Sequence, residues 1–129
     1  MNTKSEIGKS GEEMAADFLI NKKYKIIEIN YRQVFGEIDI VAKSPNRTLV
    51  FVEVKTLIAG GGGIAPEDNM TSAKIKKFKR IAQFYAAKNP KLIDEEKGWR
   101  MDVVAIDMPD NSNAYDFRAP QIRHYENIA

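Results

Sequence analysis

The chain has 129 residues, of which 43% are hydrophobic and 29% charged, as is ordinary for one soluble globular domain with its own core. It contains no cysteine, which excludes disulfides and thiolate metal sites. The formal net charge of +2 argues neither for nor against nucleic acid. The first residues form no apolar signal segment, and no stretch reaches the ~20 apolar residues of a membrane span. We therefore expect a single cytoplasmic domain, residues 1–129, outside the membrane.

Residues 5–22 predict an amphipathic helix, because their apolar residues recur at helical spacing. Most acids of this segment fall on the side that faces water. Glu12 does not, because it lies beside Leu19 at the edge of the apolar stripe. Its carboxylate either reaches water from the rim or leans toward whatever the helix packs against. Residues 24–31 follow as a strand.

Residues 36–56 predict two strands joined by a tight turn at Ser44–Arg47. Alternation gives one aliphatic face, made of Ile38, Ile40, Ala42, Val50, Val52 and Val54, and a second face with Glu37, Asp39, Val41, Phe51, Glu53 and Lys55. The strands are nearly as apolar as strands covered on both sides. Ionised groups there cost free energy unless they are paired or bound to a metal. The alternative is that these charged residues form an ordinary polar face exposed to solvent. We favour the interpretation that they form a functional site.

A glycine run, 60–63, follows the hairpin. It lacks the Gly-Lys-Ser/Thr ending of a phosphate-binding loop, and we interpret it as a flexible loop beside the charged face. Residues 70–89 predict a second helix, with five cations among positions 74–80. Such a segment, with Lys74, Lys77 and Arg80, can neutralise phosphates, although a solvated helix face is the commoner case.

Residues 99–106 predict a further strand, with Asp102 as its interior acid, and a last edge strand is expected within 117–128. His124, the single histidine, lies in this tail and is expected to be structural or exposed. The order of helix, three strands, helix and strand indicates an α/β fold with helices packed against a mixed sheet.

Asp39 and Glu53 would lie on adjacent strands and share a face. Two carboxylates so placed make a hard oxygen site suited to Mg²⁺ or Mn²⁺, with waters as the remaining ligands. Lys55, on the same face, would orient a water or stabilise charge that builds on a phosphate. Glu12, from the first helix, would complete the acid cluster.

Asp39 followed by Glu53-Val54-Lys55 resembles the Asp…Glu-x-Lys signature of the restriction-endonuclease-like nucleases. More closely, the chain is similar to the YraN family of small bacterial proteins, which are related to archaeal Holliday-junction resolvases. The similarity spans roughly residues 8–107. It rests on Gly11-Glu12, Asn30-Tyr31-Arg32, Gly36-Glu37-Ile38-Asp39-Ile40-Val41-Ala42, Val50-Phe51-Val52-Glu53-Val54-Lys55-Thr56, Lys74 and Arg100-Met101-Asp102-Val103-Val104.

The resemblance implies a restriction-endonuclease-like αβββαβ core and a metal-dependent endonuclease acting on DNA, with branched DNA in recombination or repair as the candidate substrate. By this resemblance Asp39 and Glu53 would be metal ligands, Lys55 the catalytic lysine and Glu12 a helix-borne acid. A supporting hydrogen bond is the role we expect for Glu37. By the same matches Asn30, Arg32 and Lys74 would be phosphate contacts or structural anchors, and Asp102 a structural acid paired with Arg32 or Arg100.

One departure is Leu57, which stands where the family often has an arginine. A homodimer is plausible by analogy with the resolvases. Two rival functions stay open on the sequence: a nucleic-acid-binding module without catalysis, and a scaffold protein whose acids and lysine simply pair with one another.

Overall fold

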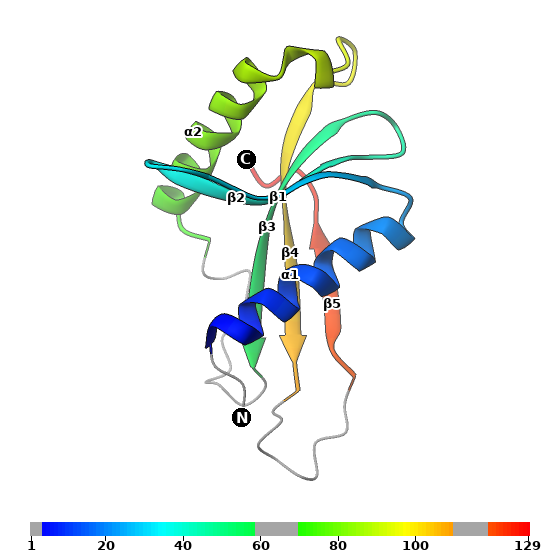
Figure 1. Ribbon diagram of the computed structural model, residues 1–129, viewed down its shortest axis with the longest axis vertical. Helices are drawn as coiled ribbons and strands as arrows, with labels where there is room; N and C mark the ends of the chain where they lie inside the picture. Colours follow the sequence, from blue (N-terminus) through cyan, green and yellow to red (C-terminus); the bar gives the residue numbers. More distant parts are fainter. Residues whose placement is uncertain (1–3, 59–69, 110–118) are drawn as a thin grey trace.

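Figure 1 shows the computed structural model, which describes residues 4–58, 70–109 and 119–129. The elements in chain order are α1 (Lys4–Asn21), β1 (Lys25–Gln33), β2 (Gly36–Lys43), β3 (Leu49–Ile58), α2 (Ser72–Lys88), a short 3₁₀ turn η2 (Pro90–Leu92), β4 (Trp99–Met108) and β5 (Gln121–Tyr125). The predicted αβββαβ core is confirmed, with β5 as an added strand. The glycine run at 60–63 lies outside the described residues.

The strands form one mixed sheet in the order β1-β2-β3-β4-β5. β1, β2 and β3 are consecutive antiparallel neighbours, β3 and β4 are parallel, and β5 returns antiparallel to β4. Parallel neighbours cannot be joined by a tight turn, and α2 lies in the connection between β3 and β4. The turn at Ser44–Arg47 is as predicted, because Arg47 N–H donates to the Ser44 carbonyl at 2.9 Å.

The two helices cover opposite faces of the sheet, which explains why the central strands are apolar on both sides. Under α1 the core contains Ala15, Ala16, Leu19, Ile40, Ala42, Val50, Val52, Val104 and Ile106. Under α2 it contains Ile38, Val41, Leu49, Phe51, Phe78, Ile81, Ala82, Tyr85 and Met101. Alternate strand residues therefore supply the two cores.

One predicted side-chain direction is wrong. Strict alternation places Ile38 on the same face as Ile40, yet Ile38 belongs to the core under α2 and Ile40 to the core under α1. The alternation breaks at Asp39, because the paired ladder between β2 and β3 ends at Ile40 and Val52. The opposite strand is irregular here too, since Asn30 has a positive φ of 56°.

The second helix begins at Ser72, within the predicted range of 70–89. Thr71 is its N-cap, and the hydroxyl accepts a hydrogen bond from Lys74 N–H at 3.2 Å. Neither described helix combines the length and the hydrophobicity that a membrane crossing requires.

Candidate metal and nucleic-acid site

Asp39 lies where β2 separates from β3. Its Oδ2 accepts a hydrogen bond from the backbone N–H of Val54 at 2.8 Å. The Asp39 carboxylate thus satisfies a backbone N–H of β3 that the backbone of β2 would bond if the ladder continued. Because the ladder ends at this point, the sheet opens beside Asp39 and Glu53, which are both half-buried.

Burial raises the pKa of Asp39 to about 7, although the hydrogen bond from Val54 acts to lower it. The negative charges of Glu53, Glu12 and Glu37 raise the pKa further. The structure therefore brings the four predicted carboxylates into one electrostatic neighbourhood. A site of this kind has excess negative charge at neutral pH, which a bound cation would relieve.

Glu12 reaches this neighbourhood because α1 lies very close to β3. A Cβ atom on Gly11 would be only 2.3 Å from the Thr56 hydroxyl oxygen. Glycine inside a helix usually weakens it, and here it permits the approach. The next residue, Glu12, is then placed half-buried near Asp39.

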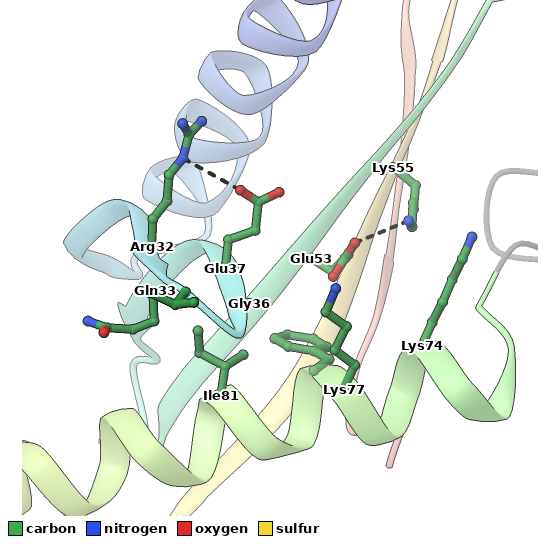
Figure 2. Close-up of a pocket in the computed structure, with 11 residues that line it drawn as sticks. Arg32, Gln33, Gly36, Glu37, Glu53, Lys55, Lys74, Lys77 and Ile81 are labelled. Carbon is green, nitrogen blue, oxygen red and sulfur yellow. Dashed lines mark ion pairs between the residues drawn. The ribbon is translucent and has the colours of Figure 1, made fainter.

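An open cavity of about 400 Å³ lies between the β1–β2 hairpin, β3 and α2 (Figure 2). Two ion pairs border it. Lys55 Nζ lies 3.1 Å from Glu53 Oε1, and both side chains are about a quarter exposed, at 22% and 26%. Arg32 Nε lies 3.5 Å from Glu37 Oε2, and both of these side chains are largely exposed. Glu37 therefore pairs with Arg32, while its predicted supporting role for a metal ligand stays untested.

The basic segment of α2 contributes to the cavity unequally. Lys74 and Lys77 line it and project from α2 toward the sheet, opposite Glu53 and Lys55 (Figure 2). Arg80 does not line it and instead lies over the Phe35 ring, 5.1 Å from the centroid. The cavity thus has a cationic wall on α2, and on its sheet side Glu37 and Glu53 are paired with Arg32 and Lys55.

The donor set fits a hard divalent cation. Asp39 and Glu53 offer carboxylate oxygens on adjacent strands, and Mg²⁺ commonly takes one or two carboxylates and keeps several waters. In the described part of the chain, however, these acids are not part of a group of three ligands within 4.8 Å of one another. Water or a substrate oxygen would therefore have to supply the other positions.

A tighter cluster of acid and imidazole groups lies elsewhere. Ligand atoms of Asp102, His124 and Glu126 lie within 4.8 Å of one another, so this group could in principle hold a metal. Arg100 already bonds two of its members: its Nε donates to Asp102 Oδ1 at 3.0 Å and its Nη2 to Glu126 Oε1 at 3.1 Å. A guanidinium at this position supplies the positive charge that a metal would otherwise provide.

Asp102 is fully buried and ionised in this network. Burial opposes its ionisation, but hydrogen bonds from His124, Arg100 and the Asn127 N–H outweigh burial and hold its pKa below the ordinary value. Of the two predicted partners of Asp102, Arg100 is the one found. His124 was expected to be structural or exposed; it is structural, with Nε2 2.8 Å from Asp102 Oδ2 and a side chain only 4% exposed. The bonds of Asp102 with His124 and with the Asn127 N–H join β5 and the C-terminal residues to β4.

The fold and site define a class of protein: a small mixed α/β domain with an αβββαβ core and carboxylates beside a basic helix. The chain belongs to the uncharacterised protein family UPF0102, whose model matches residues 11–106. The predicted membership of the YraN family is thereby confirmed.

Several relatives are similar over most of their length. A UPF0102 protein of Thermodesulfovibrio yellowstonii is 42% identical over 101 residues, covering 78% of this chain and 85% of that protein. One from Persephonella marina is 40% identical over 99 residues, covering 77% and 81%. One from Mycobacterium tuberculosis is 34% identical over 132 residues, covering 98% and 94%. Their names state the family and no activity.

Proposed function

We propose that the protein is a metal-dependent phosphodiesterase that acts on nucleic acid, with DNA as the expected substrate and the cytoplasm as its place of action. The observation that carries this proposal is the pairing of two features in one cavity. Glu37 and Glu53, whose charges act on Asp39, line this cavity together with Lys55, Lys74 and Lys77, whereas Asp39 and Glu12 do not line it themselves. A phosphodiester is an anion, so acids alone would repel it and cations alone would give no hydrolytic site.

The residues have separable roles in this proposal. Asp39 and Glu53 would hold Mg²⁺ or Mn²⁺, which as a Lewis acid polarises a phosphoryl oxygen and lowers the pKa of a bound water. Lys55 lies against Glu53 and would orient the attacking water or stabilise the charge that builds on the phosphate. Lys74 and Lys77 would hold flanking phosphates along α2. Glu12 would act from the helix side of the acid group.

The resemblance to restriction-endonuclease-like nucleases supports the same assignment. It rests on the Asp39 and Glu53-Val54-Lys55 positions, which the fold places at adjacent strands beside the opening of the sheet. Branched DNA is the substrate structure that this resemblance favours.

The test is cleavage of labelled linear and four-way branched DNA in Mg²⁺, Mn²⁺ or EDTA. We expect cleavage that requires metal and that falls at least about 100-fold in Glu53→Gln and in Lys55→Met, as for loss of an acid–base or metal-site group. Glu12→Gln should also lose activity, whereas the neighbouring exposed Glu13→Gln should not.

Binding is tested separately by fluorescence anisotropy. Lys77→Gln should weaken DNA binding several-fold and reduce the salt dependence by about one phosphate contact. Lys79→Gln is the matched control, because Lys79 is exposed on the same helix and does not line the cavity. Salt-dependent DNA binding without cleavage in either metal would overturn the enzyme proposal and favour the binding module. The absence of both DNA binding and cleavage would overturn the enzyme proposal and the binding module alike.

A further inference from the structure

The tip of the β1–β2 hairpin has an unusual composition. Gln33 pairs with Gly36, so Val34 and Phe35 are the two central residues of a two-residue turn. Such turns usually contain Gly, Asn or Asp, which adopt positive φ readily. Neither Val34 nor Phe35 has a positive φ. Turn formation therefore does not explain why a β-branched and an aromatic residue occupy these two positions.

Phe35 has a packing role, and it fixes the tip in place. Its ring meets Phe84 of α2 edge-on at 5.1 Å between centroids, and the Arg80 guanidinium covers it. A Cβ on Gly36 would touch the Ile81 side chain at 3.5 Å, so the backbone also lies directly against α2. The hairpin tip is thus held against the helix by several contacts, and Figure 1 shows the β2 ribbon passing beside α2.

Val34 has no such role, because its relative exposure is 106%. Single exposed apolar side chains are common and need no explanation by themselves. The position of this one is informative: Val34 lines the same cavity as Glu53 and Lys55, whereas the other exposed large apolar residues in the described ranges, Ile20 and Ile29, do not.

Cations line the same cavity as this apolar tip. Arg32 is on the hairpin itself, and Lys74 and Lys77 project into the cavity from α2 (Figure 2). A nucleic-acid strand whose phosphates contact these cations would run past the hairpin tip. Its bases would then meet a rigid, fully exposed isopropyl group.

We infer that Val34 is a wedge that inserts between adjacent bases of nucleic acid bound in the cavity. Apolar side chains that enter a base step replace part of the stacking and kink the helix. Unstacking has a free-energy cost, which is least where stacking is already interrupted. Val34 therefore makes the site prefer a nick, branch or mismatch over a continuous duplex. This inference rests on the proposed function and specifies which nucleic-acid structures the same site selects.

The test compares binding to a continuous duplex and to the same duplex with a central nick. Ca²⁺ replaces Mg²⁺, and 2-aminopurine beside the nick reports unstacking by a rise in fluorescence. The wild type should bind the nicked duplex about tenfold more tightly, with a fluorescence rise. Val34→Ser should lose both effects and keep its affinity for the continuous duplex. Val34→Phe should retain the preference.

Ile20→Ser is the control for removing an exposed apolar group, and it should behave as the wild type. Circular dichroism verifies that each variant is folded. Equal binding of the two duplexes by the wild type, a preference that survives Val34→Ser, or no binding at all would overturn the wedge. Cleavage in Mg²⁺ or Mn²⁺ without a Val34-dependent preference would overturn the wedge alone. A Val34-dependent preference without cleavage would leave the wedge standing and remove the phosphodiesterase.

Discussion

Asp39 Oδ2 accepts the Val54 N–H at 2.8 Å, at the point where the ladder between β2 and β3 ends. One carboxylate oxygen of Asp39 therefore bonds the backbone of β3 where the ladder ends, and the group also experiences the charges of Glu53, Glu12 and Glu37. The hydrogen bond and the surrounding charges act in opposite directions on Asp39. Burial with three neighbouring carboxylates prevails and raises its pKa to about 7. Asp39 is thus a structural group and a candidate ligand at once.

The raised pKa of Asp39 predicts how stability depends on pH in EDTA. The folded pKa lies above the unfolded value of 3.8, so the folded state binds more protons between these two pH values. The contribution of Asp39 to stability is complete below about pH 4 and is lost as the pH rises toward 7. Above that pH the ionised group destabilises the fold by an amount on the order of 4 kcal/mol.

Asp39→Asn should remove this dependence, because the amide oxygen can still accept from Val54. We expect the variant to be more stable than the wild type at pH 8 and nearly equal to it at pH 4, measured by urea unfolding. Asp17→Asn, an exposed position on α1, is the control. An equal difference at both pH values would show that Asp39 ionises normally.

Metal binding should release a proton from the same group. A cation needs the ionised carboxylate, so below pH 7 it must displace the proton of Asp39. We expect Mn²⁺ affinity to rise about tenfold per pH unit below 7 and to level off above it. Calorimetry in buffers of different ionisation enthalpy measures the released proton. If Mn²⁺ affinity changed neither with pH nor with the Asp39→Asn substitution, the metal would bind at a site that does not include Asp39.

Sequence periodicity was sufficient to predict the helices, the strands and their order along the chain, because each strand and helix buries a regular set of positions. It was insufficient for Ile38, whose direction depends on Asp39 interrupting the ladder through a side-chain bond to another strand. The Asp102–His124 pair was missed for a similar reason: β5 must first lie beside β4 before the two groups meet. The acids around Asp39 come together as the hairpin pattern predicted, and their chemistry stays a prediction.

Substitutions at Gly11 and Thr56 should have strongly non-additive effects on the stability of the fold. Gly11→Ala gains helix propensity of about 1 kcal/mol, but its Cβ would overlap the Thr56 hydroxyl, which lies 2.3 Å away. We expect net destabilisation and, through displacement of Glu12, lower activity. In the Thr56→Ala background the nearest remaining atom is the Cβ at 3.4 Å, so Gly11→Ala should there be neutral or stabilising. Additive effects in this double-mutant cycle would exclude the close approach as the cause.

Asp102 should be among the most sensitive positions for stability. Asp102→Ala leaves Arg100 and His124 without their buried partner, and breaking a buried pair in this way costs about 3–5 kcal/mol. Glu126→Gln removes a carboxylate that is 55% exposed and should cost far less. Thermal unfolding with and without EDTA tests the nature of the cluster. If Arg100 supplies its positive charge, the chelator leaves the unfolding temperature unchanged, and a marked drop would reveal a bound metal at Asp102, His124 and Glu126.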